Sequence, residues 1–218
     1  MRQRIFAEFL GTAFLLAVVV GSGIMGQRLA GGNEALVLLV NSTATGAGLL
    51  ALIATLAPVS GAHFNPLVSL TMYVRGDLPW KALPGYVIAQ FAGAIIGVFA
   101  THAMFGIPIL EVAGKPRPGL ALAWSELIAT FGLLLVVHHT SAKRPEAVPA
   151  AVGCYIAAAY WFTSSTSLAN PAVALARTLT DTFAGINPVN LPAFVAAECS
   201  GALLFLYYLH RTTMHAPS

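Results

Sequence analysis

Charge is scarce in this sequence: only 9% of its 218 residues are charged, against about 25% in an average soluble domain. So few charges cannot cover a water-facing surface, and the 57% apolar content and mean hydropathy of +0.78 indicate an integral membrane protein. The two cysteines, Cys154 and Cys199, lie inside apolar runs, which excludes a disulfide scaffold or a Cys-rich metal site. The eleven Lys and Arg are scattered, so they suit membrane anchoring better than nucleic-acid binding.

Six apolar runs approach the ~20 residues that a membrane-spanning helix needs. They cover residues 5–25, 35–56, 84–105, 120–138, 148–165 and 192–209. Two shorter apolar segments, 66–74 and 171–179, have about half that length, and each begins at an Asn-Pro pair. Because proline is favoured at the first position of a helix, we expect both to be re-entrant half-helices. The sequence therefore predicts an all-α membrane protein.

An internal repeat organises the chain. Its matched segments are 8–16 (EFLGTAFLL) with 126–134 (ELIATFGLL), 60–70 (SGAHFNPLVSL) with 165–175 (STSLANPAVAL), and 84–96 (PGYVIAQFAGAII) with 192–204 (PAFVAAECSGALL). The three matches occur in the same order in both copies, which makes a chance origin improbable.

The repeat predicts the topology. The two copies, approximately 1–110 and 120–218, each hold three full spans, and three is odd. The second copy must therefore enter the membrane from the opposite face, as in an inverted-topology repeat. We expect a single transmembrane channel domain over 1–218, in which the half-helices enter from opposite faces and bring their Asn-Pro ends together near the midplane.

Loop charges predict the orientation of the chain. If the N-terminus lies inside the cell, the cytoplasmic side carries more Lys and Arg residues than the outer side. The positive-inside rule then places both termini in the cytoplasm and the chain in the cell (inner) membrane.

The functional prediction is based on the two Asn-Pro turns. A helix N-terminus bears roughly half a positive charge and free N–H donors, so two of them aimed at one point repel cations and attract solute oxygens. Asn65 and Asn170 can each cap a half-helix with the side-chain oxygen and direct an NH₂ group into the lumen. Irregular backbone at membrane depth must be buried in protein or line a wet pathway.

Extended segments before each turn supply hydrogen-bond acceptors. Their backbone carbonyls are expected to line the pathway at Gly61, Ala62, His63, Thr166 and Leu168. Donors at the centre with acceptors on either side indicate a conduit for small neutral hydroxylated molecules. Metal binding by His63 is improbable because no partner ligands accompany it, and no catalytic constellation suggests an enzyme.

The chain resembles the aquaporin, or major intrinsic protein, family over essentially its whole length. The resemblance rests on the repeat and on two Asn-Pro-Ala-type boxes, Asn65-Pro66-Leu67 and Asn170-Pro171-Ala172. It implies an inverted repeat of six transmembrane helices plus two half-helices, with a pore in each subunit of a homotetramer. The expected partners are small neutral solutes, water and lipid, with no cofactor and no metal.

The resemblance also implies a role for two intramembrane carboxylates. Glu8 and Glu126 are expected to brace the re-entrant loops by accepting hydrogen bonds from their amides, a structural role favoured over proton relay. Glu198 is placed like Gln90 of the other repeat. We interpret Glu198 as helix-packing polarity or an interface contact.

Two departures from the family pattern affect selectivity. Leu67 stands where the first box normally has Ala, and Val173 stands where an Arg normally follows the second box. Matched against water channels, the four outer filter positions fall at Thr45, Ala158, Ser167 and Val173. If the count along the fifth span is off, Ala159 or Tyr160 faces the lumen instead.

This filter set holds no aromatic ring and no charge, unlike that of a water-selective member. The resemblance then favours a wide passive channel for glycerol-like polyols and metalloid hydroxides such as arsenite, with water. Arg177, one turn beyond Val173, either rims the outer vestibule or acts as a headgroup anchor or ion-pair partner of Asp181. The alternatives are an orthodox water channel and, from another class, an ion- or proton-coupled transporter.

Overall fold

The computed structural model describes residues 1–213, which form helices and no strand. The helices long and apolar enough to cross a membrane are α1 (Arg2–Leu29), α2 (Glu34–Ser60), α4 (Leu83–Phe105), α5 (Leu120–Lys143) and α8 (Leu191–Thr213). The remaining span, the fifth along the chain, is α6 (Val148–Phe162). It has 15 residues, and the 3₁₀ turn η1 (Pro145–Ala147) before it extends it to about 28 Å. The six predicted spans are confirmed; residues 214–218, the end of the predicted domain and second repeat, lie outside the described residues.

Two short helices interrupt this series. α3 (Pro66–Val74) has nine residues, whereas α7 (Pro171–Ala176) has six and continues as the 3₁₀ turn η2 (Arg177–Leu179). Each starts at the expected proline, where the missing N–H costs no helical hydrogen bond. A further 3₁₀ turn, η3 (Pro188–Asn190), leads into α8.

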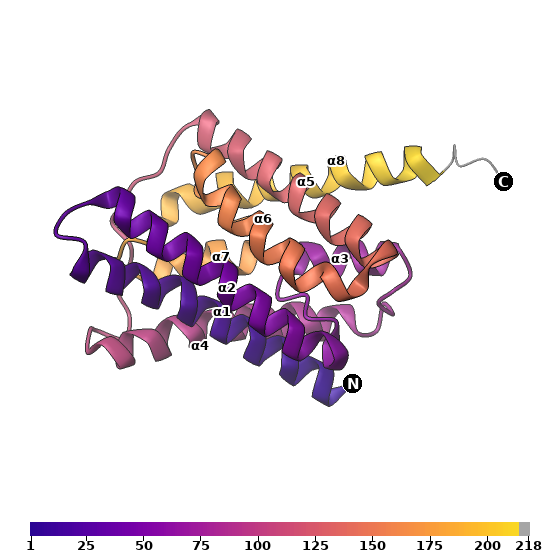
Figure 1. Ribbon diagram of the computed structural model, residues 1–218, viewed down its shortest axis with the longest axis horizontal. Helices are drawn as coiled ribbons and strands as arrows, with labels where there is room; N and C mark the ends of the chain where they lie inside the picture. Colours follow the sequence, from indigo (N-terminus) through magenta and orange to yellow (C-terminus); the bar gives the residue numbers. More distant parts are fainter. Residues whose placement is uncertain (214–218) are drawn as a thin grey trace.

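The packing of the first four helices is repeated by the last four. α1 packs against α2 and α4, and α5 packs in the same way against α6 and α8. The two halves meet where α2 contacts α6, where α3 contacts α7 and α8, and where α4 contacts α7 (Figure 1). The N-terminus and the end of α8 lie at the same end of the bundle, here called the terminal side. The other end carries the α1–α2, α4–α5 and α6–α7 loops and is called the loop side.

Glycines set the closest helix crossings at equivalent places in both halves. A Cβ atom on Gly93 of α4 would collide with the backbone oxygen of Phe9 in α1. Gly201 of α8 stands in the same relation to Leu127 of α5. Small residues at such crossings let transmembrane helices approach until their backbones touch.

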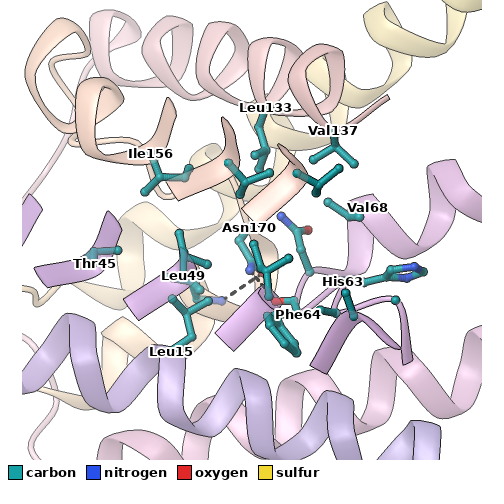
Figure 2. A pocket seen from close by; sticks show the side chains of 18 of the residues that line it. Leu15, Thr45, Leu49, His63, Phe64, Val68, Leu133, Val137, Ile156 and Asn170 are labelled. Carbon is teal, nitrogen blue, oxygen red and sulfur yellow. Dashed lines mark hydrogen bonds between the residues drawn. The ribbon is translucent and has the colours of Figure 1, made fainter. Parts of the chain in front are cut away.

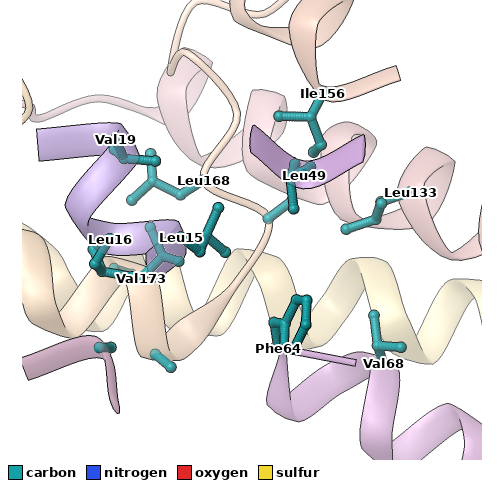
Figure 3. Close-up of a cluster of buried hydrophobic side chains, with 14 of the residues drawn as sticks. Leu15, Leu16, Val19, Leu49, Phe64, Val68, Leu133, Ile156, Leu168 and Val173 are labelled. Atoms are coloured by element: carbon teal, nitrogen blue, oxygen red, sulfur yellow. The ribbon is translucent and has the colours of Figure 1, made fainter. Parts of the chain in front are cut away.

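The largest buried apolar cluster draws side chains from the long helices and from both re-entrant loops. Phe64 and Val68 come from the first loop and half-helix, and Leu168 and Val173 from the second (Figure 3). The half-helices are therefore part of the core of the bundle.

Candidate functional site

The two Asn-Pro turns cap their own half-helices. The Asn65 side-chain oxygen accepts a hydrogen bond from the Leu67 amide at 2.9 Å, and the Asn170 oxygen accepts one from the Ala172 amide at 3.0 Å. The side chains of Leu67 and Ala172 are buried but do not line the cavity described below. The substitution in the first box is therefore a matter of packing between the half-helices.

The same asparagines tie the two repeats together. Asn65 Nδ2 donates to the carbonyl oxygen of Ala169 at 2.7 Å, and Asn170 Nδ2 donates to that of Phe64 at 2.8 Å. The half-helix ends thus meet tip to tip. Each of these bonds uses one of the two amide hydrogens, and both asparagines also line the cavity, so a second donor on each is available there.

Both loops contain strained backbone at residues that are not glycine. The φ angle is positive at Ala62, Phe64, Thr166, Ser167 and Ala169, with values from 48° to 65°. A left-handed conformation costs an L-residue roughly 1–2 kcal/mol and persists where the surroundings impose it. No Gly or Asn pattern in the sequence signals these positions.

Buried carboxylates hold the amides in and next to these strained segments. Glu8, fully buried in α1, accepts hydrogen bonds from the amides of His63 (3.0 Å) and Phe64 (2.8 Å). Glu126, fully buried in α5, accepts from the amides of Leu168 (3.0 Å) and Ala169 (2.8 Å). Each repeat therefore uses the carboxylate of its first helix to hold its re-entrant loop.

Glu198 differs from its sequence interpretation. It is fully buried in α8, and its Oε1 accepts a hydrogen bond from the Asn170 amide at 3.1 Å. It is therefore neither a subunit-interface contact nor general helix-packing polarity, because it touches the second box directly. The sequence placed it opposite Gln90 but did not reveal this contact.

Most residues whose carbonyls were expected to line the pathway lie along the cavity. Gly61, Ala62 and His63 line the cavity from the first loop, and Ser167 and Leu168 from the second. Within residues 1–213, no hydrogen-bond donor of the chain reaches the carbonyls of these five residues. Thr166 does not line the cavity, and its hydroxyl instead accepts a hydrogen bond from Arg117.

A cavity of about 240 Å³ passes these groups. It extends from Ser141 and Pro145 on the terminal side to Tyr160 and Arg177 on the loop side, with Asn65 and Asn170 between. Much of its wall is apolar; the residues of this apolar wall are Leu15, Leu49, Leu133, Val137 and Ile156, which lie around Asn170 in Figure 2. The cavity thus offers hydrogen-bond donors and acceptors within a largely hydrocarbon lining.

The expected filter residue of the fifth span is corrected by two positions. Ala158 is exposed on the outside of the bundle, whereas Tyr160 is buried and lines the cavity with Thr45, Ser167 and Val173. A helix turns by about 100° per residue, so a two-residue shift moves the position to a different face. Tyr160 OH and Thr45 Oγ1 are 3.2 Å apart and hydrogen-bonded. Tyr160, one of the two alternatives considered for the fifth span, therefore brings an aromatic ring to the cavity, whereas the first assignment, Ala158, does not line it.

Two arginines lie near Tyr160 at the loop-side end of the cavity. Arg177 is only 3% exposed and lines the cavity, and its Nε donates to the carbonyl of Ala184, so it is not a headgroup anchor. Asp181 instead accepts a hydrogen bond from the Gly114 amide. Arg117 of the α4–α5 loop was not predicted; its Nη2 lies 3.5 Å from Thr166 Oγ1, and burial beside Arg177 lowers its pKa to about 10. The described residues contain no cluster of three His, Cys, Asp or Glu suited to a metal.

Comparisons with known proteins agree with this architecture. The model of the major intrinsic protein family matches residues 1–167. The chain is similar to aquaglyceroporin AqpS of Rhizobium meliloti, with 52% identity over 206 residues covering 94% of this chain and 88% of that protein. It is also similar to aquaporin NIP6-1 of Arabidopsis thaliana, with 28% identity over 207 residues covering 93% of this chain and 66% of that protein.

A solved structure supports the fold. The X-ray structure of the aquaglyceroporin from Plasmodium falciparum superposes with a TM-score of 0.73 at 24% identity, and the match covers 95% of this chain and 94% of that one. Its arrangement of helices is therefore shared. With the family model matched over most of the sequence, the chain belongs to the major intrinsic protein family, whose members are membrane channels and not enzymes.

Proposed function

We propose that this chain is a passive channel for small uncharged solutes, namely glycerol-like polyols and metalloid hydroxides such as arsenite in its neutral form, together with water. The main support for a passive channel is the cavity, because it passes the paired asparagines and no carboxylate is among the described residues that line it. A coupled transporter needs a titratable or cation-binding group at the crossing point. The asparagine amides and apolar wall found there disfavour that alternative.

The polar side of the cavity suits hydroxylated solutes. A solute hydroxyl donates to the free loop carbonyls and accepts from the remaining amide hydrogens of Asn65 and Asn170. The apolar wall offers no replacement for the hydration shell of an ion, so an ion that enters loses hydration without compensation. Neutral molecules pass because they keep their hydrogen bonds while their carbon or metalloid centres contact hydrocarbon.

The loop-side constriction sets the solute size in this proposal. Val173 occupies the place of the usual filter arginine, which leaves room for a solute larger than water. Arg177 lies one turn further along and lines the same cavity, so it supplies positive potential at the outer vestibule without filling the aperture. The name of the relative AqpS, an aquaglyceroporin, supports this choice over an orthodox water channel.

Proteoliposome swelling followed by light scattering tests the proposal. We expect glycerol and arsenite to enter down their own gradients at rates that do not depend on a proton gradient. Water flux without glycerol, urea or arsenite flux would instead favour the orthodox water channel. Flux that requires a proton gradient would favour the coupled transporter.

We also propose that the channel is a homotetramer in the cell membrane with cytoplasmic termini. Large apolar side chains exposed on the bundle, such as Phe14, Leu39, Ile88 and Leu203, support a lipid or subunit environment. Native mass spectrometry from detergent should give a mass of four chains. Labelling of a cysteine added at the N-terminus should occur only after the cell membrane is permeabilised.

A further inference from the structure

The second re-entrant loop is held by two carboxyl groups, whereas the first is held by one. Glu126 and Glu198 are both fully buried and accept hydrogen bonds from three consecutive amides, those of Leu168, Ala169 and Asn170. Their side chains also interact with each other. At the equivalent place in the first loop, Glu8 is joined by the neutral amide of Gln90.

The number of donors differs between the two loops. Glu8 alone receives four hydrogen bonds, from Ser60 Oγ, the His63 amide, the Phe64 amide and Gln90 Nε2. One ionised carboxylate is thereby satisfied. The carboxyl pair of the second loop has four oxygen atoms and receives three donors, and Oε2 of Glu198 is buried without a partner in the described chain.

Two adjacent negative charges are unfavourable in such a dry place. Two like charges that interact inside a protein disfavour double ionisation, and such a pair titrates as a unit. Arg177 is a cation that acts electrostatically on Glu198, but no ion pair joins it to either carboxylate; within residues 1–213 the ion pair found is Arg75 with Asp77. The Arg177 Nε is instead directed to the carbonyl of Ala184.

We propose that Glu126 and Glu198 share one proton, which is held on Oε2 of Glu198 and donated to Glu126. Glu198 is then a positioning residue that holds the Asn170 amide as a neutral acid. Each Asn-Pro turn consequently has a single negative charge behind it, from Glu8 in one repeat and from the carboxyl pair in the other. The fourth oxygen becomes a donor, which explains why no amide reaches it.

Infrared spectroscopy of the full-length protein at neutral pH tests the proposal directly. A protonated carboxyl group has a C=O stretching band separate from carboxylate bands. We expect one such band from a buried acid in the wild type and its loss in Glu198→Gln. The matched control is Glu146→Gln, which removes an exposed carboxyl group in η1 and should leave the band unchanged.

Three results would overturn the proposal. These are the absence of a buried-acid band in the wild type, its persistence in Glu198→Gln, or its loss only in Glu126→Gln. The first would show that both groups are ionised, and the other two that the proton lies elsewhere. None of these measurements involves transport, so their outcome does not depend on which solutes the channel conducts.

The pH dependence of stability gives a second test. A group that is buried in its protonated form contributes stability that is lost as the pH rises. The groups facing Glu198 are Glu126 from α5 and Arg177 from η2, with Cys199 beside it on α8. We expect the thermal unfolding midpoint to fall more steeply toward alkaline pH in the wild type than in Glu198→Gln. Parallel curves would contradict the shared proton.

Discussion

The loop between α2 and α3 and the loop between α6 and α7 follow similar paths but are stabilised and used differently. Both contain left-handed residues, both end in an asparagine cap, and each asparagine donates to the other loop. The first loop depends on the single carboxylate Glu8, and the second on Glu126 and Glu198 together. Inverted symmetry therefore fixes the backbone, while the chemistry of each loop diverged.

The proposed constriction lies beside only one of the two loops. Thr45, Tyr160, Ser167 and Val173 line the cavity on the loop side, next to the second half-helix. On the terminal side the first loop contributes His63, whose Nδ1 is hydrogen-bonded to Ser69 at 3.0 Å. We propose that the residues beside the second loop select solutes by size, whereas the first loop contributes polar groups to the cavity wall. Each prediction below tests this division.

The largest effect is expected at Glu8. In Glu8→Gln, an NH₂ group replaces one carboxylate oxygen and confronts donors that lose their acceptor. Each unsatisfied buried donor costs about 1–3 kcal/mol, so a loss of about 3 kcal/mol in unfolding free energy is expected. Glu126→Gln should cost less, because Glu126 accepts from two amides and the proposed Glu198 proton, whereas Glu8 accepts from four donors. Thermal unfolding in detergent measures both losses of stability. An equal loss in the two variants, or a larger loss in Glu126→Gln, would contradict the difference between the two loops.

The third residue of the first box should affect stability and not selectivity. Leu67→Ala restores the usual box but leaves a cavity in the core, at a cost of about 2 kcal/mol. Because Leu67 is buried and does not line the cavity, the ratio of glycerol to water flux in the folded protein should not change. Unfolding midpoints and liposome swelling measured on the same preparation check both parts. A changed flux ratio would place Leu67 in the selection of solutes.

The Val173 position should control solute size. Val173→Arg introduces a bulky cation at the constriction and should lower glycerol flux about tenfold, equivalent to about 1.4 kcal/mol on the barrier, with a smaller loss of water flux. Val173→Leu is the control for added volume without charge, and it should reduce glycerol flux less. Equal losses of glycerol and water in folded tetramers would show that Val173 is not at the constriction.

Much of the fold was predictable from the sequence because it follows from hydrophobic length and repeat parity. The six spans, the half-helix starts at Pro66 and Pro171, and the meeting of the asparagines required only apolar runs and an odd number of spans. The sequence could not decide between Ala158 and the alternatives Ala159 and Tyr160, since a shift of one or two residues rotates a helix face and α6 is apolar all round. The contacts of Arg117 and Glu198 depend on tertiary packing, for which one sequence offers no signal.

The smallest effect is expected at Tyr160, the cavity-lining residue of the fifth span. Tyr160→Ala removes the ring at the constriction and should raise the flux of a polyol larger than glycerol, relative to water, a few-fold, because the expected change in barrier is below about 1 kcal/mol. Ala158→Leu enlarges a side chain on the exposed face of the same helix, so it should leave the ratio unchanged. Tyr160→Phe keeps the packing and removes only the hydrogen bond to Thr45, which separates loss of the ring from loss of the hydroxyl. If Ala158→Leu changed the ratio of polyol to water flux and Tyr160→Ala did not, the fifth-span filter residue would be Ala158. The evidence for selection beside the second loop would then come from Ser167 and Val173 alone.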